Sequence, residues 1–175
     1  MLKVITDELC PADRGEVSLL CMLDLSAAFD TVDHDILIGR LQQSLEVKGL
    51  ALSWIESFLC NRTQSVSIDG VQSTRSLLTC GVPQGSMLDP VLFLVYCDDV
   101  ITIAPRHGLE VHSYVDDTQL YFHADPSAVN SKVLKLVTCV GDIGQWMCAN
   151  RLKLKQEKSQ FIWLGTPHQL SKLQL

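Results

Sequence analysis

The chain has 175 residues, of which 47% are hydrophobic, so a single domain with a sizeable core is expected. Its formal net charge of −6 excludes a free-standing basic nucleic-acid binder, because such a protein carries a surplus of Lys and Arg. The seven cysteines include no Cys-x-x-Cys pair, and several lie in apolar runs, which indicates reduced core residues of an intracellular protein.

The sequence predicts neither a membrane segment nor a zinc site. The N-terminus lacks a basic and apolar signal pattern. The most apolar stretch, residues 90–104, is interrupted by Asp98 and Asp99 and is too short to span a bilayer. His107 and His112 are expected at the surface or in a strand rather than as zinc ligands. We therefore expect a soluble protein of the nucleus or cytoplasm.

The first half of the chain predicts one strand, two helices and a hairpin. Residues 1–16 are weakly patterned, and the apolar run at 17–24 is typical of a strand buried on both faces. Periodic apolar residues predict helices near 34–46 and 50–60. Residues 63–73 alternate polar and apolar side chains around an Asp-Gly pair, which indicates a β-hairpin.

The second half adds two helices and three strands. A long apolar helix is expected near 87–103, then strands near 109–115 and 118–123, a helix at 126–147 and a strand near 160–164. Strands and helices are intermixed without regular βαβ alternation. This order predicts an α+β fold, with an antiparallel sheet and helices packed on one face.

Two adjacent carboxylates, Asp116 and Asp117, lie between two of these strands. In a regular strand they would point to opposite faces, but at the tip of a tight hairpin both can approach one point. Neighbouring anions repel each other unless a cation lies between them, and Mg²⁺ prefers oxygen ligands. Taken alone, the pair is more often a solvated turn, and a third carboxylate from elsewhere changes that balance.

The third carboxylate is Asp24, which directly follows the first buried strand. A charge at that place is costly unless it is capped, paired or bound to a metal. Asp24 or Asp30 could cap the next helix, but Asp33 is the simpler cap for the periodic residues that follow it. Asp24 is therefore predicted to be available for chemistry.

Four segments, in order, resemble motifs of reverse transcriptases, and their wording is closest to the non-LTR (LINE-type) retrotransposon enzymes. The segments are 24–30 (DLSAAFD), 81–86 (GVPQGS), 114–117 (YVDD) and a tail from Trp146 to Ser159. The resemblance implies a polymerase palm over residues 17–165, with a remnant at 1–16 and a C-terminal tail at 166–175. Few basic residues precede Asp24 and little follows Gly165, so truncated fingers and an absent thumb are expected.

By this resemblance the protein is an RNA-directed DNA polymerase, which joins deoxynucleotides to the 3′-hydroxyl of a DNA primer on an RNA template. Two Mg²⁺ ions, or Mn²⁺, about 3.5–4 Å apart would activate that hydroxyl and stabilise the leaving pyrophosphate. The resemblance assigns the metals to Asp24 and Asp116, with Asp117 contributing less directly. It makes the backbone carbonyl of Leu25 a further ligand.

The resemblance also assigns residues to the substrates. Phe29 matches a steric gate against the ribose 2′-hydroxyl, although a core aromatic is an alternative. Gln84 and Gly85 would contact the template and the incoming base, although a plain loop before a helix is the alternative. Lys158 would act as general acid at the pyrophosphate, and a solvated surface lysine is equally compatible. Asp89 stands where the family usually has Gly and is expected to perturb this loop.

A second segment, Tyr96-Cys97-Asp98-Asp99, also reads Tyr-x-Asp-Asp. It ends a long apolar run in a helical context, so it is not expected to be catalytic. Two alternatives to an active enzyme stay open: a truncated, catalytically inactive retrotransposon relic, and a non-enzymatic binding protein that uses the palm surface. An intact set of acids counts modestly against the second.

Overall fold

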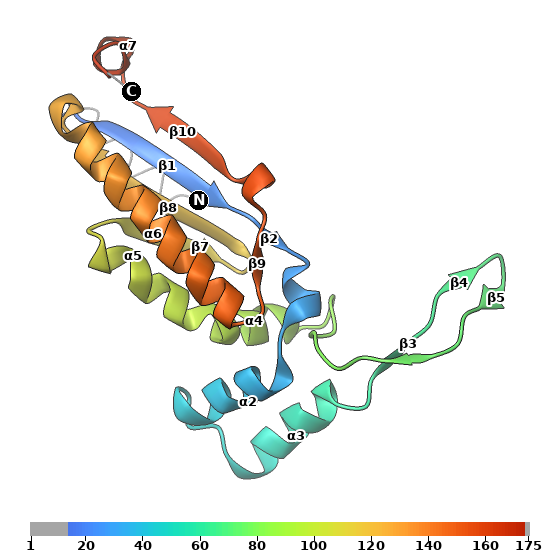
Figure 1. The fold of residues 1–175 in the computed structure, drawn as a ribbon. Helices are drawn as coiled ribbons and strands as arrows, with labels where there is room; N and C mark the ends of the chain where they lie inside the picture. The colour runs from blue at the N-terminus through green and yellow to red at the C-terminus, as the bar shows by residue number, and fades with distance from the viewer. Residues whose placement is uncertain (1–13, 174–175) are drawn as a thin grey trace.

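The computed structural model describes residues 14–173 and is built around one antiparallel sheet with strand order β10-β1-β8-β7 (Figure 1). Its strands are β1 (Val17–Leu23), β7 (Glu110–Tyr114), β8 (Asp117–Ala124) and β10 (Gln160–Leu164). The predicted remnant at 1–16 and the predicted tail at 166–175 each lie partly outside the described residues, and Cys10 lies outside them.

Strand β1 lies between β8 and β10, which explains why its sequence is almost wholly apolar. Leu19 pairs with Phe122 on one side and with Trp163 on the other, and those two rings meet edge to face. At its far end Leu23 pairs with Thr118, close to the tip of the β7–β8 hairpin. The sheet register therefore carries the end of β1 to that tip.

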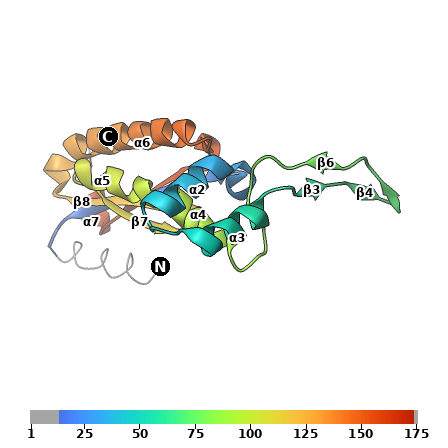
Figure 2. The ribbon, with the colours of Figure 1, turned by 90° about the horizontal axis from the view of Figure 1, so that it is seen from below.

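Helix α6 lies along one face of the sheet with the shorter α4 and α5 beside it, while α2 and α3 lie beyond the end of the sheet (Figures 1 and 2). The helices are α2 (His34–Gln43), α3 (Gly49–Leu59), α4 (Asp89–Cys97), α5 (Ile103–Arg106), α6 (Val129–Ala149) and α7 (Pro167–Leu170). The predicted α+β class is thus confirmed. Within residues 14–173, no helix is long and apolar enough to cross a membrane.

Individual boundaries test the sequence predictions. Asp33 caps α2 as predicted, since its carboxylate accepts the N–H groups of Asp35 and Ile36 at 3.0 and 3.1 Å. This helix ends at Gln43 rather than near residue 46, and Leu45 beyond its end is exposed. The expected continuous helix over 87–103 is wrong, because α4 gives way to the 3₁₀ helix η2 (Asp98–Thr102) before α5 begins.

Residues 61–79, which we call the arm, project away from the sheet (Figures 1 and 2). Their strands are β3 (Thr63–Gln64), β4 (Ser67–Ile68), β5 (Val71–Gln72) and β6 (Ser76–Leu77), all exposed. The predicted hairpin is confirmed, with Asp69 and Gly70 at positive φ in its turn.

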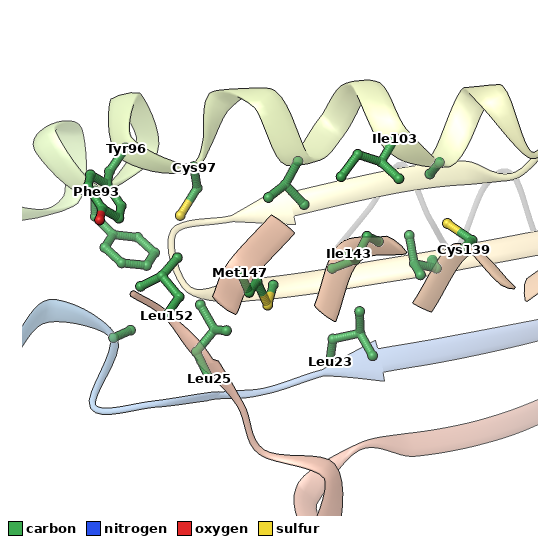
Figure 3. Packing of buried hydrophobic residues seen from close by; sticks show 14 of the residues in the cluster. Leu23, Leu25, Phe93, Tyr96, Cys97, Ile103, Cys139, Ile143, Met147 and Leu152 are labelled. Atoms are coloured by element: carbon green, nitrogen blue, oxygen red, sulfur yellow. The ribbon is translucent and has the colours of Figure 1, made fainter. Parts of the chain in front are cut away.

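The core fills the space between the sheet and the helices, where Figure 3 shows residues of β1, α4 and α6 together. It includes Cys21, Cys97 and Cys139, as expected for reduced core thiols. Three other cysteines are exposed: Cys60, Cys80 and Cys148. Asp24 and Asp116 are half-buried and Asp117 is exposed, so the three acids lie at the border of this core.

Candidate active site

The β7–β8 hairpin turns through only two residues, because Tyr114 pairs with Asp117 and leaves Val115 and Asp116 as the loop. Val115 has a φ of 57°, which is rare for a β-branched residue and ends the regular alternation of side chains. The Asp116 carboxylate lies close enough to α4 to add to the raised pKa of Cys97, about 12, whose main cause is burial. Asp116 thus lies at the edge of the core.

Asp24 reaches the same place from β1. Leu23 pairs with Thr118, so continuing the register by one residue sets Asp24 against Asp117. Loss of surrounding water raises the pKa of Asp117, and the carboxylates of Asp116 and then Asp24 raise it further. The structure therefore brings the three predicted acids together into one electrostatic cluster.

Directly after Asp24 the chain forms a second, two-stranded sheet from β2 (Leu25–Ser26) and β9 (Lys153–Leu154). The Lys155 N–H donates to the Asp24 carbonyl at 2.8 Å. Since hydrogen-bonded and non-hydrogen-bonded pairs alternate along antiparallel strands, the carbonyl of Leu25 points away from β9. That oxygen is not used by this sheet.

Lys158 is carried back to Asp24 by the 3₁₀ helix η4 (Gln156–Lys158). Its Nζ lies 3.6 Å from Asp24 Oδ2, and the two side chains are 61% and 31% exposed. Pairs this exposed contribute only about 0.2–1 kcal/mol, so the contact is easily exchanged for another partner. The structure thus brings together four of the predicted residues, with Leu25 beside them.

The glycine loop, residues 81–86, packs on the segment that follows Asp24. The Gly81 N–H donates to the Val32 carbonyl at 2.8 Å, and the Val82 N–H donates to the Phe29 carbonyl at 2.9 Å. Gly81 has a φ of 87°, and a Cβ there would lie 3.0 Å from the Asp30 carbonyl oxygen. Only glycine fits this close approach without a shift of the backbone.

Asp89 holds the other end of the glycine loop. The side chain of Asp89 is buried, and its Oδ2 accepts the Gly85 N–H at 2.6 Å. Its own N–H donates to Ser86 Oγ at 3.1 Å. Asp89 therefore ties the loop to the start of α4, and its expected perturbation of the loop stays a prediction. Gln84 points outward from this loop and is exposed.

Phe29 lies in the 3₁₀ helix η1 (Ala28–Thr31), half-buried, with its ring centroid 5.0 Å from that of Phe93 in α4. It packs at the edge of the core while its carbonyl binds the glycine loop. The core contact agrees with the alternative assignment, and the gate assignment stays a prediction.

The acids of the second Tyr-x-Asp-Asp segment lie just after a helix, as predicted, although its Cys97 is near Asp116. Asp98 and Asp99 follow α4 within η2 and are exposed. Asp99 Oδ2 lies 3.2 Å from Nη2 of Arg40, a residue of α2. Asp99 therefore already has a cationic partner of its own.

No cluster of three or more His, Cys, Asp or Glu side chains within residues 14–173 is arranged to hold a metal ion. Mg²⁺ commonly binds through one or two carboxylates, with substrate phosphates and water completing its shell, rather than in an all-protein cage. The mutual repulsion at Asp117 and the Lys158 ammonium beside Asp24 mark a place where a cation is favourable. The carboxylates are thus oxygen donors of the kind that divalent cations prefer.

Curated relatives share sequence with the chain over much of its length. It is 28% identical over 147 residues to "RNA-directed DNA polymerase from mobile element jockey" of Drosophila melanogaster, which covers 84% of this chain and 15% of the relative. A jockey protein of Drosophila funebris is 31% identical over 66% of the chain and 13% of the relative. The Pol polyprotein from element R2 of Popillia japonica is 27% identical over 67% of this chain and 21% of the relative.

Solved telomerases share the fold. Apo telomerase of Candida tropicalis superposes with a TM-score of 0.67 and 11% identity, over 94% of this chain and 35% of its own. The Candida albicans telomerase bound to a telomeric RNA fragment superposes with a TM-score of 0.66 and 12% identity, over 91% of this chain and 30% of its own. The antiparallel sheet with helices on one face is thus a fold shared with these telomerases, and it agrees with the palm-like fold predicted from the sequence.

The family described as "Reverse transcriptase (RNA-dependent DNA polymerase)" matches residues 4–171. The chain belongs to this family, and the predicted likeness to non-LTR retrotransposon enzymes is confirmed by the jockey relatives. It spans only 15% of the first relative's length.

Proposed function

We propose that the chain is the catalytic palm of an RNA-directed DNA polymerase that joins deoxynucleotides to a primer 3′-hydroxyl. The observation that carries this proposal is the meeting of Asp24, Asp116 and Asp117 at the hairpin tip, with Lys158 beside them. Membership of the reverse transcriptase family supports it, as does the name of the jockey relatives.

In this proposal Asp24 and Asp116 hold divalent ions, with the outward carbonyl of Leu25 as a further oxygen ligand. Bound Mg²⁺ or Mn²⁺ would supply activation of the primer hydroxyl and neutralisation of the phosphate charge. Asp117 adds negative charge to the site. Its pKa is raised mainly by loss of surrounding water and further by repulsion from Asp116 and Asp24, and a bound cation would relieve that repulsion. The three acids therefore favour a cation where phosphates arrive.

Lys158 would donate a proton to the leaving pyrophosphate. Its ammonium already lies 3.6 Å from Asp24 Oδ2, so only a small movement of this exposed side chain separates it from a phosphate. A cation bound at Asp24 would compete for the same carboxylate and release Lys158 toward the substrate. The weakness of the pair suits this exchange.

The glycine loop would meet the RNA template and the incoming deoxynucleoside triphosphate. Gln84 is exposed, and Gly85 is held by Asp89, so a polar side chain is presented from a fixed backbone. The Phe29 carbonyl accepts the Val82 N–H of this loop, so the Phe29 ring lies next to the loop, where its bulk would exclude a ribose 2′-hydroxyl. The domain bounds 17–165 belong to the same proposal.

The test replaces the matching segment of the Drosophila melanogaster jockey polymerase by residues 1–175, because the chain spans only part of that relative. We expect this chimera to extend a DNA primer on RNA with Mg²⁺, and Asp116→Asn to abolish extension. Asp98→Asn, which changes the other Tyr-x-Asp-Asp segment, should leave extension intact. A folded chimera without extension, or extension independent of Asp116, would overturn the proposal and favour an inactive relic.

A further inference from the structure

Tyr96, the first residue of the second Tyr-x-Asp-Asp segment, takes part in a polar cluster with residues of α2 and of the end of α6. Tyr96 of α4 is fully buried, and its hydroxyl donates to the Asn150 carbonyl at 2.6 Å. The same hydroxyl accepts the Asp33 N–H at 3.3 Å. One oxygen thus joins the start of α2 to the end of α6, and Figure 3 shows Tyr96 beside Phe93 at this end of the core.

Arg40 of α2 completes the cluster. Its Nη1 donates to the Tyr96 carbonyl, and its Nη2 donates to Asn150 Oδ1 at 2.8 Å. The guanidinium also lies over two rings, 5.3 Å from the Tyr96 centroid and 5.0 Å from that of Trp146. The planar cation is therefore held from several directions, which lysine could not reproduce.

These contacts of Tyr96 and Arg40 hold the turn between α6 and β9, which begins at Asn150. Asn150 Nδ2 donates to the Trp146 carbonyl at 2.8 Å, and the next residue, Arg151, has a φ of 57°. Arg151 Nε lies 3.0 Å from Asp33 Oδ2, a second link to the start of α2. The chain leaves this turn directly into β9, whose partner strand β2 begins one residue after Asp24.

We propose that Tyr96, Arg40 and Asn150 form a clamp that positions β9, and through it Lys158, against Asp24. This inference rests on the proposed function, since it concerns the place of the proton donor. Tyr96 is a positioning residue here and touches no reacting atom. The geometric link is the Lys155 N–H on the Asp24 carbonyl, three residues before Lys158.

The first test uses the 175-residue chain itself and the variant Tyr96→Phe, which removes the hydroxyl and keeps the ring under Arg40. Amide hydrogen exchange measured by NMR should be about 2- to 10-fold faster at Lys155, because a net hydrogen bond holding the turn is lost. Exchange of the β1–β8 amides should stay unchanged. The matched control is Tyr114→Phe, since Tyr114 is 72% exposed. Unchanged exchange at Lys155, or equal acceleration everywhere, would overturn the clamp.

The second test asks whether Tyr96 acts through Lys158, in the chimera described above. Tyr96→Phe should lower kcat for nucleotide addition with little change in KM. Combined with Lys158→Met, it should cause no further loss, because the positioned group is already gone. If the double variant instead loses kcat by the product of the two single losses, Tyr96 does not act through Lys158 and the clamp is overturned as a positioning device. Primer extension that is unchanged by Asp116→Asn would contradict the proposed function instead. The hydrogen-exchange test on the 175-residue chain would still show whether the clamp exists.

Discussion

Gly81→Ala should strongly destabilise the chain, because two separate costs meet at this residue. Its φ of 87° lies in the left-handed region, where an L side chain costs roughly 1–2 kcal/mol. An added Cβ would also lie 3.0 Å from the carbonyl oxygen and 3.1 Å from the Cα of Asp30, and relieving such backbone contacts costs about 1–3 kcal/mol. The sum is about 2–5 kcal/mol.

Gly85→Ala is the matched control for this substitution. Gly85 has a nearly equal φ of 84°, but a Cβ there meets no atom within 4 Å. Both variants gain the same small stabilisation from a stiffer unfolded chain, so their difference isolates the contact with Asp30. We expect Gly81→Ala to lose about 1–3 kcal/mol more than Gly85→Ala.

Urea unfolding followed by circular dichroism measures this difference. With a slope of about 1–3 kcal/mol per molar urea, the midpoint of Gly81→Ala should fall roughly 1 M below that of Gly85→Ala. Gly81 is further fixed through its carbonyl, which accepts from His34 and Arg62 at 2.9 and 3.0 Å. Equal midpoints for the two variants would refute the close approach of this loop to Asp30.

Three other predictions concern neighbouring side chains. Folding raises the pKa of Asp117 above 3.8, so the folded chain binds this proton more tightly and loses stability as the pH rises above about 3.8. Asp117→Asn, which stays neutral, should therefore raise the urea midpoint at about pH 7 but hardly at about pH 3. Asp89→Ala should cost about 1–3 kcal/mol by leaving the Gly85 N–H unpaired, and an unchanged midpoint would contradict the bond. Phe29→Val in the chimera should raise ribonucleotide incorporation relative to deoxyribonucleotide, whereas unchanged sugar choice would leave Phe29 as a core residue only.

Local signals were sufficient for much of the fold. Asp33 as a helix cap and the Asp-Gly turn of the arm depend on short-range hydrogen bonds and backbone preferences, which adjacent residues encode. The break after Cys97 is not predicted, because the apolar stretch resumes at Val100 after Asp98 and Asp99, and the change from α4 to the 3₁₀ helix η2 has no clear sequence signal.

Long-range contacts could not be predicted in the same way. The acids were found because each follows or interrupts an apolar strand, but the contact of Lys158 with Asp24 depends on how β9 pairs with β2. Arg40 was missed, although a lone cation next to the buried Leu41 on α2 was a signal. Its partners lie 56 and 110 residues away, which periodicity does not reveal.

The arm gives the chain a natural place to be divided in two. Its exposed tip at Asp69 and Gly70 makes no core contact, so a protease cut there should be tolerated. The first fragment would carry β1, and the second would carry β8 and β10, which flank β1 in the sheet. The two pieces should therefore stay associated after cleavage, and separately expressed halves should reassemble around β1.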